Sequence, residues 1–491
     1  MVRRNLSKEN YLVFSDVHLG ADLVQHARPW TIARLRRAAR IDRELASMLD
    51  HYRGQRDPER PWRLVIAGDL VDFIGMSIAP LPGDGLDTAL TDEEREYGLG
   101  STAQHAVAKM HAVALRHSLV FERIAAFVMD GNALVLVRGN HDVDFHWESA
   151  RAAFVEALAA RLPGGAADEA TRAALEARVE FAPWFYYVEG LLYVEHGHQY
   201  DAMCSYLSPL VPLSPTDPSR IGWSISDVLL RWVVRPTRGL SSEGHDDLGA
   251  IDYLRVAVGL GVGGAVRLFV RYASAIAHMV RTSRAYVDER AAWLRAEHER
   301  GVAQLARRWQ VAAGAVRALA SLGAPPTRSR VMAIFSSLLV DRLALVGLGA
   351  LALVAIWLLG PGVWSKLGAS AVILPLVTMF YVRFSRARHL NATDALRRSA
   401  AQIARLFPAR FVVMGHTHEP VRERVAADTT YFNVGAWAVD ELELPEGAPI
   451  AAHRTHLVIR HVDGVACAEL VRWDSVRGPH AVSWPPSPEV P

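Results

Sequence analysis

The sequence LVLVRGNHDVDF, residues 134–145, places an apolar run directly before the Gly-Asn-His-Asp cluster at 139–142. The four apolar residues at 134–137 are typical of a strand buried on both faces. Gly, Asn and Asp are common turn residues, so the fragment by itself predicts a strand followed by an ordinary turn. Whether that turn carries chemistry depends on similar clusters elsewhere in the chain.

Four other stretches repeat this arrangement of an apolar run followed by residues that can bind metals. They are SDVH with Asp16 and His18, GDLVD with Asp69 and Asp72, EHGH with His196 and His198, and GHTH with His416 and His418. A lone Asp-x-His pair is most often structural. Five clusters of oxygen and nitrogen donors, each after a predicted strand and none with thiols, predict a metal site.

The donor types indicate which ions and which reaction to expect. Carboxylate, amide and imidazole groups suit Mn²⁺, Fe²⁺ or Zn²⁺ rather than Ca²⁺ or Cu⁺. A carboxylate such as Asp69 can bridge two ions, and ions about 3.5–4 Å apart can bind phosphoryl oxygens and activate water for attack on phosphorus. The leaving group needs a proton or a positive partner, for which His141 beside Asn140 is the candidate. We expect Asp142 to orient that imidazole, and the role of Asp72 stays open between structural and catalytic.

The pattern of apolar and polar residues changes twice along the chain. In residues 1–205, short apolar runs alternate with helical spacing at 31–52 and 103–130, which predicts the first part of a layered α/β or α+β domain. Residues 206–400 show long helical patterns rich in Ala, Leu, Val and Arg. Strand patterns return in 401–473, so the middle is predicted to be a helical insertion in one domain. The Pro-rich tail, 474–491, is predicted to be disordered. The predicted strands lie at 11–14, 63–67, 134–137, 191–195, 410–414, 431–434 and 456–460.

The composition excludes some functions. Lys and Arg number 54 against 52 Asp and Glu, so no polyelectrolyte partner is implied, and no basic stripe mixed with aromatics flanks the clusters as in a nuclease. No nucleic acid partner is therefore expected. Two cysteines exclude a disulfide scaffold and a Cys-rich zinc site. A hydrophobic content of 51% and a mean hydropathy of +0.10 are high for a soluble protein.

The insertion contains two uncharged runs that favour a membrane hairpin at about 343–382. The first, 343–359, is long enough to span a bilayer, while the second, 367–382, is short of the usual ~20 residues. Arginines flank the pair on both sides, which predicts cytoplasmic outer ends and a catalytic domain facing the cytoplasm at the inner membrane. These are Arg328, Arg330 and Arg342 before the pair, and Arg383, Arg386 and Arg388 after it. The alternative is a helical hairpin buried within a soluble domain.

Two further segments of the insertion, 223–235 and 253–284, mix apolar residues with arginines. Such segments can lie on an anionic bilayer with the arginines toward the head groups. They can equally be amphipathic helices that pack on the protein core. Both interpretations stay open.

In this order the five motifs resemble those of the calcineurin-like metallophosphoesterases, over the α/β portions at both ends of the chain. The resemblance implies a four-layer α+β/α/β sandwich of two mixed sheets flanked by helices, here with a large helical, membrane-associated insertion. It also implies two divalent metal ions, Mn²⁺ first and Fe²⁺ or Zn²⁺ as alternatives. One ion would be held by Asp16, His18 and His418, the other by Asn140, His196 and His416, and Asp69 would bridge them. Purple acid phosphatases, in the same superfamily, have an Fe³⁺-binding Tyr where this chain has Asp72.

Three features are similar to the UDP-2,3-diacylglucosamine pyrophosphatase branch of lipid A synthesis. They are SDVHLG at the start, Asp201 after the His-Gly motif, and FNVGAW after GHTH. This resemblance implies hydrolysis of a pyrophosphate on a two-acyl-chain sugar at the inner membrane, with release of UMP. Members of that branch have Arg where this chain has His141, and they lack so large an insertion.

The expected function is therefore membrane-associated, dinuclear-metal hydrolysis of a phosphoester or pyrophosphate. The expected partners are a phosphorylated small-molecule or lipid substrate and membrane lipids. One alternative is a membrane-tethered phosphatase or phosphodiesterase that acts on a soluble substrate. A more distant alternative is an inactive membrane scaffold, although none of the seven expected metal ligands is missing from the sequence.

Overall fold

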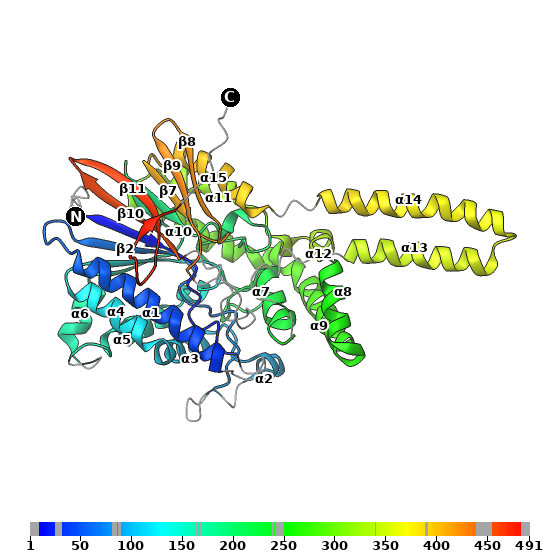
Figure 1. Ribbon diagram of the computed structural model, residues 1–491, viewed down its shortest axis with the longest axis horizontal. Helices are drawn as coiled ribbons and strands as arrows, with labels where there is room; N and C mark the ends of the chain where they lie inside the picture. Colours follow the sequence, from blue (N-terminus) through cyan, green and yellow to red (C-terminus); the bar gives the residue numbers. More distant parts are fainter. Residues whose placement is uncertain are drawn as a thin grey trace.

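The computed structural model of the protein describes residues 9–24, 32–80, 86, 90–163, 165, 168–237, 240, 250–338, 340–387, 391–437 and 454–482. Within these residues the chain forms two mixed β-sheets flanked by helices, and one pair of helices projects far from the body (Figure 1). The predicted arrangement of two mixed sheets with flanking helices is confirmed at this level.

The first sheet has seven strands in the order β12-β11-β10-β1-β2-β3-β4. Their bounds are β1 Asn10–Phe14, β2 Trp62–Ala67, β3 Ala133–Val137, β4 Val179–Ala182, β10 Thr455–Val462, β11 Val465–Arg472 and β12 His480–Ala481. Strands β1 to β4 pair in parallel, and β10 to β12 are antiparallel. The first three predicted strands are therefore confirmed as parallel neighbours, so their carboxyl ends meet at one edge.

The second sheet has five strands in the order β5-β6-β7-β9-β8. Their bounds are β5 Phe185–Val188, β6 Leu192–Glu195, β7 Phe411–Met414, β8 Pro420–Ala426 and β9 Thr429–Val434. Strands β6, β7 and β9 are parallel, while β5 and β8 are antiparallel edges. Because β6 pairs directly with β7, the long helical segment between them leaves and re-enters the same sheet.

Successive side chains of a strand point to opposite faces of the sheet, and both faces are covered here, which explains why these strands are apolar throughout. In β1, Tyr11 and Val13 belong to the core between the two sheets, whereas Leu12 and Phe14 belong to the core beneath the helices. The same division holds in β7, where Val413 faces the other sheet and Val412 faces helices. A strand covered on both faces needs apolar residues at every position, not at alternate ones.

Helices cover the outer face of each sheet. Those on the first sheet are α1 Ile32–Gly54, α3 Ala103–Arg116, α4 Ser118–Met129, α5 Glu148–Ala159 and α6 Glu169–Glu176, with the short α2 Asp92–Tyr97 nearby; those on the second are α10 Ala292–Trp309, α11 Ala313–Leu322 and α15 Ala392–Leu406. The predicted helix at 103–130 is two helices that meet at His117. The imidazole of His117 accepts a hydrogen bond from Gly20 N (3.0 Å) and contacts Asp42 (2.8 Å), which anchors the break.

The rest of the helical segment forms a smaller unit beside the sheets. Its elements are α7 Ile225–Leu229, the π-helical turn η5 Leu230–Val234, α8 Ala250–Gly259, α9 Gly261–Ser283 and α12 Val331–Ser337. Helix α7 and η5 are buried and pack against Ile74 and Val143, which lie in loops of the first sheet. The segment 223–235 is therefore core and does not lie on a membrane.

Helices α13 Val340–Leu359 and α14 Val363–Ala387 form the projecting hairpin (Figure 1). Most of their described large apolar side chains are exposed, so the alternative of a hairpin buried within the protein is wrong. Among the described residues, one helical stretch, Val363–Arg383, is long and apolar enough to cross a membrane, and Ala344–Leu359 is shorter. Helix α13 has 20 residues and α14 has 25, and the second apolar stretch is longer than the predicted 367–382 because α14 begins at Val363, directly after the turn at Pro361 and Gly362.

The predicted disordered tail, 474–491, includes residues that have a defined structure. Residues 474–482 are described, and His480–Ala481 pairs with β11 as the edge strand β12. The prediction of disorder is wrong for these residues, since backbone pairing to β11 orders them despite their polar and Pro-rich context. Residues 483–491 lie outside the described residues, as does Arg388.

Candidate metal centre

The residues of all five motifs lie in loops that leave the carboxyl ends of parallel strands. Asp16 and His18 follow β1, Asp69 follows β2, and Asn140 follows β3; from the second sheet, His196 follows β6, and His416 and His418 follow β7. Backbone hydrogen bonds join the loops to one another, including Asp16 N to Gly68 O (3.2 Å) and Gly415 N to His196 O (3.0 Å). The edges of the two sheets thus bring together all seven residues expected to bind metal.

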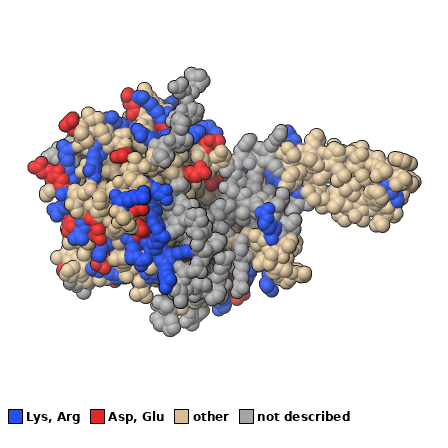
Figure 2. All heavy atoms as spheres, viewed as in Figure 1, with Lys and Arg blue, Asp and Glu red and all other residues tan. Residues whose placement is uncertain are grey.

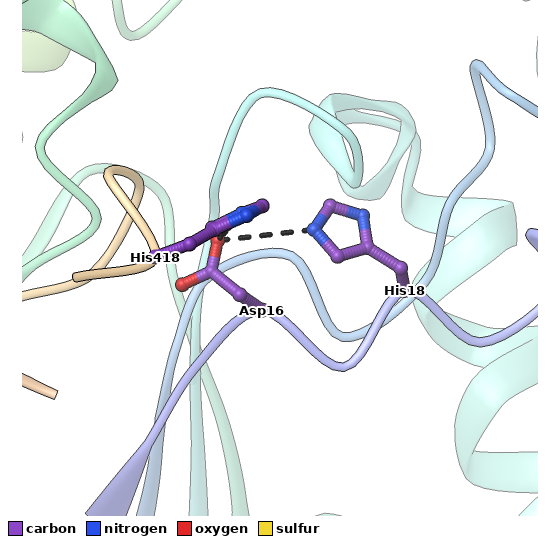
Figure 3. Close-up of side chains that lie close together, drawn as sticks. All are labelled: Asp16, His18 and His418. Atoms are coloured by element: carbon purple, nitrogen blue, oxygen red, sulfur yellow. Dashed lines mark hydrogen bonds and ion pairs between the residues drawn. The ribbon is translucent and has the colours of Figure 1, made fainter. Parts of the chain in front are cut away.

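The first group consists of Asp16, His18 and His418 (Figure 3). The Oδ1 atom of Asp16 lies 3.1 Å from His418 Nε2 and 3.8 Å from His18 Nε2. The two imidazoles approach this carboxylate from different loops, and their rings are 5.5 Å apart. This set matches the first ion site that the resemblance implies.

The second group centres on Asp69 and His196, with Asp16 completing it. His196 Nε2 lies 3.2 Å from Asp69 Oδ2 and 3.0 Å from Asn140 Oδ1. His196 Nδ1 donates to Ala67 O (2.9 Å), a contact that leaves Nε2 as the nitrogen for a metal. Asp69 Oδ2 is also 4.0 Å from His18 Nε2 of the first group, so Asp69 stands between the two groups.

Five of the seven expected ligands have a left-handed backbone conformation. The values of φ are 55° for Asp16, 52° for His18, 55° for Asp69, 71° for His416 and 59° for His418. Side chains other than Gly adopt this region at a cost, and such residues concentrate at functional sites where the surrounding structure holds them. The sequence carries no signal for this feature.

Two motif glycines make room for ligand side chains. At Gly68, whose φ is +89°, a Cβ atom would lie 2.5 Å from His196 Nδ1. At Gly139, a Cβ atom would collide with the Asp69 carboxylate. The glycine in each motif therefore permits close approach of a ligand from a different loop.

Charges within the centre stabilise one another. Burial raises the pKa of Asp69, but His196 and His141 outweigh burial and hold it far below its ordinary value. Burial lowers the pKa of His196, but Asp69 and Asp16 outweigh burial and raise it to about 9. Burial likewise opposes the low pKa of Asp16, which His418 and His196 maintain. In this centre, protons on imidazoles balance the buried carboxylates, a role that cations can take over.

The donor set fits divalent cations. Asp16 and Asp69 are fully buried, and in the described part of the chain their ion pairs are with histidines and not with Lys or Arg. His18 Nε2 is buried without a hydrogen-bond partner among the described residues, and it faces both carboxylates. Buried carboxylates close to an unpaired imidazole nitrogen form the kind of donor set that binds hard or borderline metal ions.

His141 lies beside the centre and is oriented by Asp72. His141 Nδ1 is 2.7 Å from Asp72 Oδ1, and its ring packs edge-on to His18 with centroids 4.6 Å apart. Asp72 in turn accepts from Arg235 Nη2 (2.8 Å), which comes from the helical unit. Burial lowers the pKa of His141, but Asp72 and Asp69 outweigh burial and raise it to about 9.

The expectation that Asp142 orients His141 is wrong. The Asp142 carboxylate accepts hydrogen bonds from Gly139 N (2.6 Å) and Leu70 N (3.0 Å), so it ties its own loop to the loop after β2 and does not face His141 Nδ1. Burial, followed by Asp69, raises the pKa of Asp142 to about 7. The orienting carboxylate is Asp72, whose partner Arg235 is 163 positions away and carries no local sequence signal.

His416 belongs to a third group, with Asp201 and Cys204. Its Nε2 lies 3.1 Å from Asp201 Oδ2, while its ring is 5.3 Å from that of His196. His198 is buried behind these rings, and burial lowers its pKa well below the ordinary value. Asp201 was visible in the sequence as part of the His-Gly motif, whereas nothing there singled out Cys204.

Comparison of the chain with known protein families, with curated proteins and with solved structures found no match. The family resemblance of the motifs therefore stays a proposal that the geometry of the centre must support.

Proposed function

We propose that the protein is a dinuclear-metal hydrolase of phosphoesters or pyrophosphates, of the calcineurin-like metallophosphoesterase kind and fold. The observation that carries the proposal is that donor residues from five strand ends lie together. Asp16, His18, Asp69, His196 and His418 form overlapping groups, and Asn140 and His416 lie beside His196. The left-handed conformation of five of these residues supports a binding role, because a merely structural cluster has no need of such strain.

Each residue of the centre has a role in this proposal. Asp16, His18 and His418 would hold one divalent ion, Asn140, His196 and His416 the other, and Asp69 would be shared; manganese is the first choice. The bound ions would polarise phosphoryl oxygens and lower the pKa of the attacking water. His141 would donate a proton from Nε2 to the leaving-group oxygen, since its Nδ1 faces Asp72.

The projecting hairpin supports membrane association. Most of its described large apolar side chains are exposed, and Val363–Arg383 is long enough to span the hydrocarbon of a bilayer. The arginines at its base favour cytoplasmic outer ends by the positive-inside rule, which would put the catalytic domain at the inner face of the membrane. This location favours a lipid-linked phosphate or pyrophosphate as substrate, of which UDP-2,3-diacylglucosamine is the first to test.

Metal-dependent turnover tests the enzymatic part. The full chain, purified in detergent and stripped with a chelator, should hydrolyse bis-p-nitrophenyl phosphate after addition of Mn²⁺. Asp69→Ala should abolish turnover and reduce the bound manganese measured by mass spectrometry, because the shared ligand is lost. Asp92→Ala, on the exposed surface of α2, is the control and should change neither. Manganese-dependent turnover that persists in Asp69→Ala would contradict the proposal, as would metal binding without any turnover.

Product analysis tests the substrate. The protein should release UMP from UDP-2,3-diacylglucosamine faster than it hydrolyses soluble nucleotides or simple lipid phosphates. Turnover of simple monoesters alone would reject a lipid-linked pyrophosphate and leave a membrane-tethered phosphatase.

A further inference from the structure

Helix α9 has two apolar faces, and among the described residues one is buried while the other is exposed. Gly264, Leu268, Ala275 and Met279 are buried against the helical unit. On another side of the same helix, Val262, Val266, Phe269 and Val270 are 85, 57, 73 and 54% exposed. These four residues recur at spacings of three and four, so they form one continuous stripe. We name this stripe the α9 apolar face.

A basic stripe runs along the edge of the α9 apolar face. Arg267 and Arg281 are exposed, and no ion pair of either is found among the described residues. Arg271, on the same side, donates to Pro236 O (2.8 Å). Helix α9 contains no acidic residue. An apolar stripe beside arginines, with no acidic group to repel phosphates, is the surface pattern of a helix that lies in the interface of an anionic bilayer.

The position of α9 adds to this pattern. Helix α12 contacts both α9 and α13, and Tyr272 Oη of α9 donates to Leu338 O (2.6 Å) at the end of α12. Helices α8 and α9 run across the base of the projecting hairpin and not along it (Figure 1). A bilayer entered by the hairpin would therefore meet α9 lengthwise. In Figure 2 the hairpin surface is almost entirely uncharged, and Lys and Arg atoms lie at its base.

From these observations we infer that α9 docks in the surface of an anionic bilayer, with its apolar face in the boundary between head groups and acyl chains. Arg267 and Arg281 then face lipid phosphates. The inference rests on the proposed membrane association of the hairpin and is independent of the metal chemistry. A second copy of this chain is a less favourable partner for the α9 apolar face than a bilayer, because the two basic stripes would repel each other.

Fluorescent labels at defined depths test the docking. In a Cys467→Ser background, where the remaining Cys204 is buried, single cysteines replace Phe269 on α9, Leu374 on the hairpin and Leu115 on the exposed surface of α3. The full-chain proteins are reconstituted into vesicles of phosphatidylcholine and phosphatidylglycerol whose acyl chains carry bromine, a contact quencher. Labels at 269 and 374 should lose fluorescence, and the label at 115 should not.

Removal of the negative charge from the lipid surface is the second part of the test. Without phosphatidylglycerol, quenching at 269 should fall while quenching at 374 stays. The double variant Arg267→Gln/Arg281→Gln should reduce the ratio of docked to undocked α9 by about five-fold per arginine, whereas Arg172→Gln on α6 should not change it.

The outcomes separate the inference from the proposed function. Quenching at 374 without quenching at 269 would overturn the docking of α9 and leave the hairpin in the membrane. Absence of quenching at both positions would overturn the docking together with the membrane part of the proposed function. Manganese-dependent turnover is a separate measurement, which tests the metal chemistry alone. A concentration-dependent blue shift at 269 in detergent, without quenching in vesicles, would identify a second copy as the occupant and also overturn it.

Discussion

His141 stands at the end of a chain of charged contacts that begins in the helical unit. Arg235 binds Asp72 (2.8 Å), and Asp72 binds His141 Nδ1 (2.7 Å). The carboxylate fixes the ring and favours its protonated form, so that a proton is available at Nε2 for a leaving group. At the scale of one residue, this is how the fold would prepare an acid next to a cluster of residues that could hold metal ions.

Substitution of Asp72 should move the pH dependence of turnover. In Asp72→Asn the pKa of His141 falls, because the main charge that raises it is gone, while burial still lowers it. An acid must be protonated to act, so the alkaline limb of the rate profile should shift to lower pH. His141→Gln should lower kcat by about 10²–10⁴-fold at pH values below the alkaline limb, where the wild-type imidazole is protonated, and the difference should shrink above it.

Asp142→Asn is the matched control for this experiment. It should leave the alkaline limb in place, since Asp142 contacts backbone N–H groups and not His141. If Asp142→Asn shifts the limb and Asp72→Asn does not, the assignment of the orienting carboxylate is wrong.

Gly139→Ala tests the close approach of two loops. The added methyl group would collide with the Asp69 carboxylate, so the variant should bind less manganese and lose about 1–3 kcal/mol of stability. Gly54→Ala, at the end of α1 where a Cβ meets nothing within 4 Å, should leave metal content unchanged. Metal content by mass spectrometry and thermal unfolding provide the two measurements. Normal manganese content in Gly139→Ala would contradict the role given to this glycine.

At the scale of elements, α1 is joined to β10 by a buried polar contact. Tyr52 Oη lies 2.7 Å from His456 Nε2, and both side chains are buried. Burial lowers the pKa of His456 from an ordinary 6.5 to about 3. The imidazole is therefore neutral in the folded protein over the whole range in which the unfolded chain would protonate it.

This contact should make the fold sensitive to acid. Below pH 6.5 the unfolded chain binds a proton on His456, whereas the folded protein does not bind it until about pH 3. The free energy of unfolding therefore falls as the pH decreases from 6.5 to about 3. Between pH 7 and pH 5 the loss attributable to His456 should be about 2 kcal/mol. In His456→Gln the free energy of unfolding should depend less on pH by that amount, as measured by denaturant titration in detergent. An unchanged pH dependence would show that His456 is protonated in the folded protein.

At the scale of the whole molecule, the hairpin projects from the body and joins it at its base (Figure 1). Helices α13 and α14 pack on each other, and α13 continues from α12. Replacement of residues 340–387 by a short flexible linker should therefore leave the sheets and the metal centre intact. The shortened protein should need less detergent and keep manganese-dependent turnover of bis-p-nitrophenyl phosphate, but should bind vesicles more weakly. Loss of turnover on the soluble diester would show that the hairpin supports the catalytic fold.

Much of the centre was predictable because its ligands occur in short local motifs. The runs at 11–14, 63–67 and 134–137 specify buried strands, and polar residues directly after them must then emerge at one sheet edge. The strands β4, β8, β11 and β12 were not predicted, because their partly exposed or mixed sequences have no continuous apolar pattern. Strand β5 was missed although its four residues are apolar and buried. The break at His117 was missed for a similar reason, since the contacts that anchor it come from other elements.

The sequence by itself determined the donor residues, the parallel strands that present them and the existence of an apolar hairpin, since each depends on neighbours within a few positions. Tertiary structure alone decided which side chains meet. It made Asp72 and not Asp142 the partner of His141, brought Arg235 to Asp72, and left one apolar face of α9 uncovered while it buried the other. The physical reason is that hydrogen bonds and burial depend on distance in space, and residues far apart in the chain become neighbours only when the sheets and the helical unit pack together.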